Sequence, residues 1–179
     1  MDPRRKARKL DRMLAYMLGR CPSEFGLVPL PDGRVKVREL IKALHEEDGW
    51  RHIRTADIEA SLRILKTPAV ESEAGWIRAV DRTGLAAPIP AIHPPALVYT
   101  AIRRRAWPIV RESGLKPGGL PWVVLSSDRD LAVRIGRRSD REPVVLEVAT
   151  NRARNKGVEL LDAGPPLLCT AYVPASCLH

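Results

Sequence analysis

The sequence has few aromatic residues, few cysteines and no long apolar run. Aromatic residues make up 4% of the 179 residues, so side chains on which bases stack are scarce. The three cysteines are an odd number without metal-ligand spacing, and the four histidines form no ligand pair. We therefore expect reduced thiols in the cytoplasm and no metal. Because no run approaches the roughly 20 apolar residues of a membrane span, we also expect a soluble protein.

What the sequence does have is a globular composition with an excess of positive charge. Hydrophobic residues make up 45% and charged residues 28%, which predicts a packed core. The net charge of +9 favours polyanions such as nucleic acid or a dinucleotide, although an inert basic surface is the alternative. Residues 1–85 contribute +4 (17 basic, 13 acidic) and residues 96–179 contribute +5 (13 basic, 8 acidic). The excess is therefore shared by both halves.

The first 84 residues have the pattern of three helices and a hairpin. Apolar residues at helical spacing end before Pro22, which forbids continuation of the first helix. Thr55 is the expected N-cap of the third helix, with Asp57 in its first turn. The expected helices cover 10–18, 37–44 and 55–65, and the expected strands cover 68–70 and 76–80. This order is typical of a winged helix.

A proline-rich segment separates this part from a mostly β part. Residues 85–95 contain four prolines, which stiffen a chain and supply no ladder donors, so we expect a linker there. Beyond it the expected strands cover 97–102, 122–126, 144–148 and 167–170, and the expected helices cover 103–112 and 128–135. The sequence therefore predicts an α+β protein with two lobes, residues 1–84 and 96–179.

Colinear motifs along nearly the whole chain resemble those of the NAD-dependent RNA 2′-phosphotransferase family. The opening stretch LAYMLGRCPSEFGLVPLPDGRVKVRELIKAL is similar to the family's leucine-rich helix and the turn after it. Ile77-Arg78-Ala79 matches the family's Ile-Arg-Ala strand, and residues 94–99 match its Pro-Pro-x-x-Leu-Tyr. AVRIGRRSDREPVVLEV and the closing GVELLDAGPPLLCTAYVPASCL match the last third in order and spacing.

The resemblance implies a winged helix joined to a lobe of the ADP-ribosyltransferase type, with NAD and the RNA 2′-phosphate meeting in the cleft between them. From the linker and the net positive charge of both halves we expect this cleft to be positively charged. It implies a transferase of RNA processing, as in tRNA splicing, that moves an internal RNA 2′-phosphate onto NAD and releases nicotinamide and ADP-ribose cyclic phosphate. The implied partners are NAD as co-substrate and RNA carrying a 2′-phosphate. We expect a monomer.

The departures from the family pattern concentrate in its site motifs. Gly19-Arg20 stands where the family has Arg-His, and Pro68 stands where it has an arginine. Residues 81–84 replace Gln-Gly-His-Ser. In the second lobe Thr100-Ala101-Ile102 replaces His-Gly-Thr, and residues 123–126 replace Val-His-Leu-Ser. If the cleft geometry persists, restoring the arginines at positions 19 and 68 and the histidine at position 20 should raise the rate.

Seven residues remain as site candidates. Arg138 matches a family arginine, and Arg20 lies one residue from a lost one; arginine suits phosphate because its fork binds two oxygens and stays charged. We expect Arg138 and Arg20 to be catalytic, Thr100 and Ser126 to bind the cofactor, and Arg78, Arg82 and Arg103 to bind substrate. The alternatives are structural: solvated arginines, an arginine at a helix C-terminus, and strand hydroxyls bonded to neighbouring backbone.

The arginines at 103–105 begin an expected helix, where cations oppose the helix dipole unless an anion lies nearby. This placement mildly favours a bound phosphate there.

Two other functions are alternatives to a transferase of reduced activity. One is a binding protein without turnover. The other is a winged-helix nucleic-acid binder. The mixed charge of the third helix disfavours it, because Asp57 and Glu59 accompany Arg54, Arg63 and Lys66 there.

Overall fold

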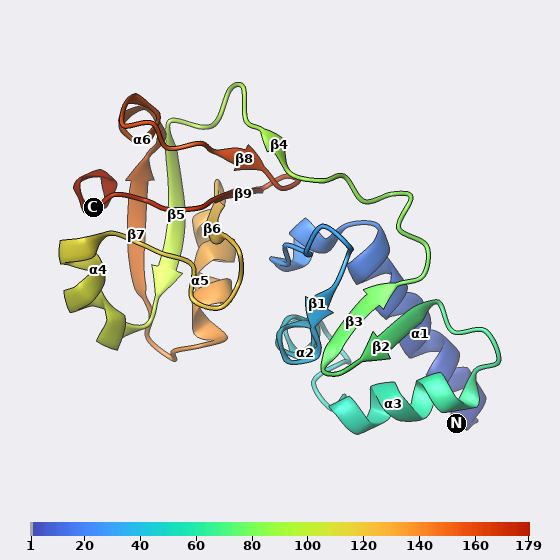
Figure 1. Ribbon diagram of the computed structural model, residues 1–179. Helices are drawn as coiled ribbons and strands as arrows, with labels where there is room; N and C mark the ends of the chain where they lie inside the picture. The colour runs from blue at the N-terminus through green and yellow to red at the C-terminus, as the bar shows by residue number, and fades with distance from the viewer. Residues whose placement is uncertain (1) are drawn as a thin grey trace. The chain divides into compact units, whose positions relative to one another are not determined.

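The computed structural model describes residues 2–179, and these divide into two compact units (Figure 1). The first unit extends to Ala86 and the second runs from Ala87 to His179. Each unit combines helices with an antiparallel sheet and has its own apolar core. The mixed helix and sheet content agrees with the expected α+β class.

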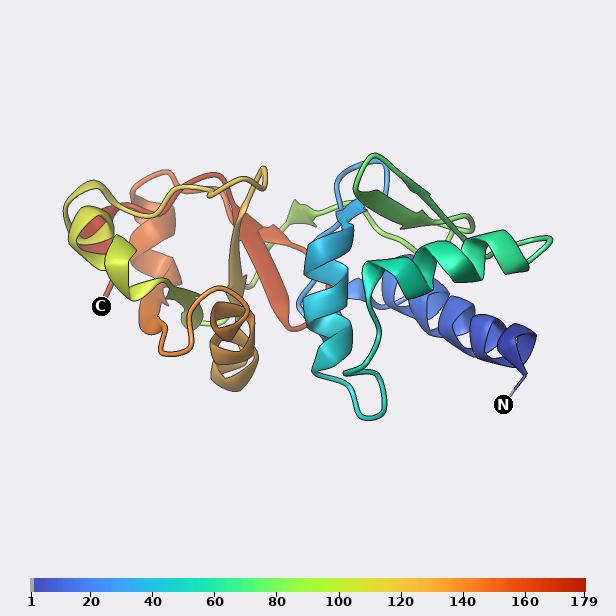
Figure 2. The same ribbon diagram turned by 90° about the horizontal axis from the view of Figure 1, so that it is seen from below.

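The first unit contains three helices and a three-stranded sheet. Its elements are α1 (Pro3–Gly19), a 3-10 turn (Pro22–Phe25), β1 (Val35–Lys36), α2 (Val37–His45), α3 (Thr55–Ile64), β2 (Val70–Glu73) and β3 (Trp76–Ala79). The strand order is β1-β3-β2, and all pairs are antiparallel. Helices α1 and α3 pack against each other, as Figure 2 shows. The three helices occur in the expected order.

Helix α1 is held by an apolar face and by one buried carboxylate. Leu14, Met17 and Leu18 are fully buried in the first core, as the helical spacing predicts. Both carboxylate oxygens of Asp11 accept the backbone N–H of Ala69, at 2.9 and 3.1 Å. This bond fixes the middle of α1 beside the segment that leads into β2.

Two local expectations for the first unit are wrong. Arg54, not Thr55, is the N-cap of α3, and its backbone N–H donates to Asp57 Oδ2 at 2.8 Å. The carboxylate in the first turn satisfies a donor there, so no Thr55 hydroxyl is needed. The strand expected at 68–70 begins at Val70 instead, because Pro68 lacks an N–H and the Ala69 N–H is bonded to Asp11.

The second unit is built on a six-stranded antiparallel sheet of order β4-β8-β9-β6-β5-β7. Its strands are β4 (Ile89–Pro90), β5 (Leu97–Ile102), β6 (Val123–Ser126), β7 (Val144–Ala149), β8 (Leu161–Asp162) and β9 (Leu167–Thr170). Its helices are a 3-10 turn (Arg104–Ala106), α4 (Trp107–Ser113), α5 (Arg129–Arg137), α6 (Thr150–Asn155) and a 3-10 turn (Ala175–Cys177). The four longest strands confirm the four expected β runs. Strand β4 pairs with β8 and lies within the segment expected to be a linker.

Among residues 2–179, no helix has both the length and the hydrophobicity needed to cross a membrane. Within the same residues, no group of three or more His, Cys, Asp or Glu side chains is placed to hold a metal ion.

Candidate functional site

An open cavity of about 860 Å³ lies in the first unit, where the C-terminal half of α1 meets the ends of the hairpin. Its lining comes from three separate segments: Arg12, Ala15, Tyr16, Gly19 and Arg20 of the α1 region, Pro68 and Ala69 before β2, and Ala79, Val80, Asp81, Thr83 and Gly84 after β3. Except for Arg82, every position at which the first half departs from the family motifs lines this cavity. The fold therefore brings the replaced residues together around one cavity.

The arginine lost at position 19 has no room to return in this backbone. Gly19 is buried, and a Cβ added there would lie 2.7 Å from the carbonyl oxygen of Asp81 and 2.9 Å from the Cβ of Ala79. Both distances are shorter than real Cβ contacts allow, and one partner is backbone. The chain leaving β3 thus lies against α1 at this point. A simple restoration of the arginine, expected above to raise the rate, does not fit without movement of residues 79–81.

The remaining charges of the cavity are two arginines and one carboxylate. Arg20 is exposed at the end of α1, where its backbone N–H donates to the Tyr16 carbonyl at 3.1 Å. Asp81 accepts the Thr83 hydroxyl at 2.7 Å and the Thr83 N–H at 3.0 Å. These bonds, assisted by the positive charge of Arg20, lower the pKa of Asp81. Asp81 is therefore ionised at neutral pH and offsets part of the charge of Arg12 and Arg20.

Tyr16 gives the cavity an aromatic side chain in a fixed position. Its hydroxyl donates to Glu24 Oε2 at 3.0 Å, and this bond is the main reason that the pKa of Tyr16 is raised to about 12. Its ring meets that of Phe25 edge to face, with centroids 5.8 Å apart. Sequence reasoning missed Tyr16 and Arg12. The signal was present, because Arg12, Tyr16 and Arg20 follow each other at four-residue intervals, which places them on neighbouring turns.

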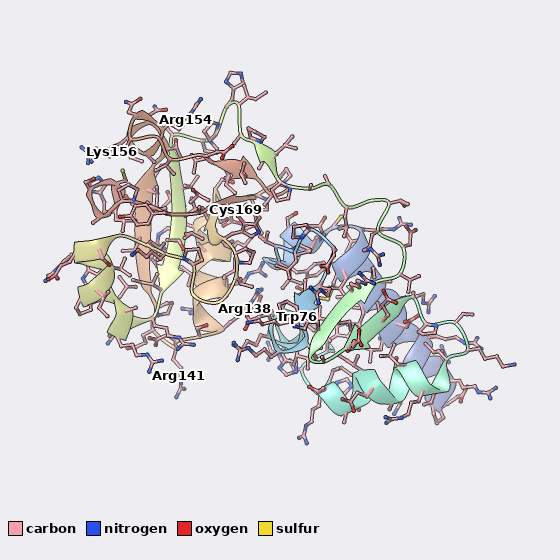
Figure 3. All side chains as sticks on the ribbon, in the orientation of Figure 1. Trp76, Arg138, Arg141, Arg154, Lys156 and Cys169 are labelled. Carbon is pink, nitrogen blue, oxygen red and sulfur yellow. The ribbon has the colours of Figure 1, made fainter. Side chains whose placement is uncertain are left out.

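The two arginines proposed for the hairpin are engaged within their own unit. Arg78 pairs with Glu71, and Arg82 donates to the Ala79 carbonyl at 2.7 Å. Arg82 also lies 3.6 Å from Glu71. Neither lines the cavity. On the same hairpin the ring of Trp76, labelled in Figure 3, faces two further cations, with Arg34 and Lys36 at 5.3 and 5.6 Å from its centroid.

In the second unit the two hydroxyls proposed for cofactor binding are buried and bonded to backbone. The Thr100 hydroxyl on β5 donates to the Val124 carbonyl at 3.0 Å, and Thr100 is only 8% exposed. Ser126, at the end of β6 and 1% exposed, accepts the Asp128 N–H at 3.0 Å. Each hydroxyl thus already has one backbone partner, and the assignment of both residues to NAD stays a prediction. Cys169, labelled in Figure 3, is no better placed for chemistry, because burial raises its pKa to about 11.

The arginine run at 103–105 has its own carboxylate partners. Arg104 donates its backbone N–H to Asp140 at 2.9 Å and its guanidinium to Glu142 at 2.8 Å. The N–H donors of Arg104 and Glu142, with the nearby arginine charges, lower the pKa of Asp140. Asp140 thus supplies an anion at this helical turn, so the dipole argument no longer requires a phosphate. Arg103 itself is exposed at the start of the turn.

Arg138 lies directly after the last residue of α5. Its backbone N–H donates to the Ile135 carbonyl at 3.2 Å, and the residue is half-buried. Arg141 follows in the next loop, and both are labelled in Figure 3. Arg141 lines an open hollow with Arg104, Arg105, Asp140 and Glu142. The second unit therefore has a cationic rim, although its carboxylates offset part of the charge.

Several known proteins that share one name are similar to this chain over most of its length. A protein of Acetivibrio thermocellus named "Probable RNA 2′-phosphotransferase" is 32% identical over 155 residues, which cover 84% of each chain. Proteins of the same name from Pyrococcus horikoshii and Burkholderia lata are 31% and 30% identical, over 95% and 98% of this chain and 96% and 92% of their own lengths. No protein-family model matches the chain.

Proposed function

The chain belongs to the RNA 2′-phosphotransferase family, and we propose that it is a divergent member that binds an RNA phosphate but transfers it to NAD slowly. The observation that carries this proposal is the cavity of the first unit. The family's motif segments line it, and it contains Arg12 and Arg20. Gly19 and Pro68, which stand where the family has arginines, contribute no charge.

The chemistry explains why the loss of charge slows the reaction. In the family reaction an RNA 2′-phosphate attacks the nicotinamide-bearing carbon of NAD, and fixed cations stabilise the shifting negative charge. A hydrogen bond to a charged group contributes about 1.5–3 kcal/mol. Two missing arginine contacts therefore correspond to a rate loss of roughly 10²–10⁴. In the first unit, Arg20 is the arginine that we assign to the phosphate. In the second unit, Arg138 matches a family arginine and stays our proposed catalytic residue.

We also propose the finer fold assignments that the resemblance implies. The order β1-β3-β2, with α1 before the first strand and α2 and α3 before the hairpin, supports a winged helix in the first unit. The six-stranded antiparallel sheet of the second unit supports a lobe of the ADP-ribosyltransferase type.

A second candidate function is RNA binding without turnover. It is favoured by the state of the two residues proposed to bind NAD. Thr100 replaces a family histidine and Ser126 lies two residues after another lost histidine, and both hydroxyls are bonded to backbone groups. This candidate shares the phosphate cavity and differs only in the NAD step.

The deciding experiment follows nicotinamide release and loss of the RNA 2′-phosphate under matched conditions, with a family member that retains the complete motifs as the reference. We expect a rate at least about 100-fold below the reference, abolished by Arg138→Gln and by Arg20→Gln. A rate equal to the reference would contradict the proposal. Tight binding of 2′-phosphorylated RNA with no turnover would establish the second candidate, and equal affinity for RNA with and without the phosphate would exclude both.

A further inference from the structure

A basic face of α1 leads away from the cavity toward the N-terminal end of the helix. Arg5, Arg8 and Arg12 are exposed and follow each other at intervals of three and four residues, which places them on one side of the helix. They line an open hollow of about 470 Å³ together with Asp2 and Asp11. Arg12 lines both this hollow and the cavity. Arg12 therefore lies at the border between the two along α1.

The spacing of the arginines suits a strand of phosphates. At 1.5 Å per residue, Arg5 and Arg12 are about 10 Å apart along the helix axis, and Arg20 is about 12 Å further. Successive cations one helical turn apart match, in order of magnitude, the distance between neighbouring phosphates of an extended strand. A nucleic-acid backbone lying along α1 would therefore reach the cavity at its far end.

The arginines of this face have no partner in the part of the chain that the structure describes, whereas both nearby carboxylates already accept backbone N–H groups. Among residues 2–179, Arg5, Arg8 and Arg12 form no ion pair or side-chain hydrogen bond. Asp2 accepts the backbone N–H of Arg4 at 3.1 Å as the N-cap of α1. Asp11 is 7% exposed, and both its oxygens are bonded to the Ala69 N–H. An incoming phosphate thus meets guanidinium groups whose hydrogen-bonding capacity is unused.

The position of these cations does not stabilise the isolated helix. The first turn of α1 contains no acidic residue but has Arg4, Arg5 and Lys6. Cations near a helix N-terminus oppose the helix dipole, at about 0.3–1 kcal/mol each. The Asp2 carboxylate at the N-cap offsets only part of this repulsion, because three cations lie in the turn that follows it. A bound phosphate would offset more of it.

We propose that the face formed by Arg5, Arg8 and Arg12, here the α1 track, binds the phosphate backbone of the RNA whose phosphate enters the cavity. The inference rests on the proposed function and adds a substrate class to it. The preferred substrate is a strand that extends several nucleotides to one side of the phosphorylated position. A short 2′-phosphorylated fragment contacts the cavity alone and misses the track.

The test measures binding of fluorescent RNAs to the full chain over a range of salt. The probes are a 2′-phosphorylated dinucleotide and a ten-nucleotide strand with the same phosphorylated site. The track variant is Arg5→Gln/Arg8→Gln, which leaves Arg12 and the cavity intact. The matched control is Lys6→Gln/Arg51→Gln, which removes the same charge from exposed positions of the same unit that line neither hollow.

We expect the track variant to bind the long strand about tenfold more weakly. The slope of log K against the logarithm of salt concentration should become shallower by about 1.4, which is 0.7 for each of two lost phosphate contacts. It should bind the dinucleotide like the wild type and melt at the same or a higher temperature. The control should match the wild type with both probes.

Equal weakening by the two double variants would overturn the α1 track, since only net charge would then matter. Loss of binding to anionic phosphatidylserine vesicles, with RNA binding unchanged, would also overturn it and assign the face to a membrane surface. A third outcome separates the two proposals. If the wild type does not bind the dinucleotide, but the track variant still binds the long strand more weakly than the wild type does, the cavity proposal fails and the α1 track stands.

Discussion

The two units have accommodated the loss of family residues in different ways. In the first unit the replaced positions still surround an open cavity, and its charged side chains, Arg12, Arg20 and Asp81, remain able to meet a ligand. In the second unit Thr100 and Ser126 lie in replaced motifs, and each hydroxyl is bonded to a backbone group, that of Thr100 to Val124 in the sheet and that of Ser126 to Asp128 at the start of α5. The comparison teaches that a binding surface survives substitution more readily at an open helix end than between paired strands. A strand hydroxyl finds a backbone partner within reach, whereas an exposed arginine finds only solvent or a ligand.

The sharpest test of this comparison is Gly19→Ala. Alanine is favoured over glycine in a helix by about 1 kcal/mol, so helix propensity alone predicts a more stable protein. The contact of the added Cβ with the Asp81 carbonyl predicts the opposite, a loss of about 1–3 kcal/mol from overpacking. We expect destabilisation in urea unfolding. Gly118→Ala is the control, because a Cβ there meets nothing within 4 Å. A stabilised Gly19→Ala variant would show that the arginine position is open after all.

Thr100→Val probes the second unit. The substitution preserves shape and removes the donor to Val124, so we expect a loss of about 0.5–1.5 kcal/mol in the free energy of unfolding. NAD binding, measured by equilibrium dialysis, should not change. The exposed Thr67→Val serves as the control for the loss of a hydroxyl. A fall in NAD affinity without a fall in stability would make Thr100 a cofactor contact and break the comparison.

Asp81→Asn tests the charge balance of the cavity. The amide oxygen can still accept from Thr83, while the negative charge beside Arg20 is removed. Because Asp81 is exposed and solvent screens its charge, 2′-phosphorylated RNA should bind only about twofold more tightly. Asp48→Asn removes the same charge from an exposed site outside the cavity and should have little effect. Equal tightening in both variants would mean that only net charge matters.

The smallest expected effect concerns Asp140 and the pH dependence of stability. Because its pKa is lowered in the folded protein, its contribution is fully present above the unfolded value near 3.8 and is lost as the pH falls through the folded value. Asp140→Asn should therefore flatten the decline in stability below about pH 4. Urea unfolding at several pH values measures this slope. An unchanged slope would show that Asp140 does not balance the charge of residues 103–105, and a phosphate would again be the expected anion there.

Local patterns predicted much of the fold. The helices from Val37 and Thr55 follow from apolar residues at helical spacing, and β5 and β9 have the expected bounds. Helix α1 contains the expected range 10–18 but begins at Pro3, because the basic residues before Leu10 extend it. Motif order along the chain identified the family without any knowledge of contacts. Short elements such as β1 and β8 escaped prediction, because two residues carry no periodicity and form only when a partner strand is present.

What the sequence determined by itself was family, element order and the identity of the replaced residues, because each of these is encoded in neighbouring positions. What only the tertiary structure decided was the state of the site. The approach of Asp81 to Gly19, the bond from Ala69 to Asp11 and the pairing of Arg104 with Asp140 join residues 36 to 62 positions apart. No spacing rule reaches that far. These contacts determine which arginines remain available for a phosphate and which hydroxyls are already engaged.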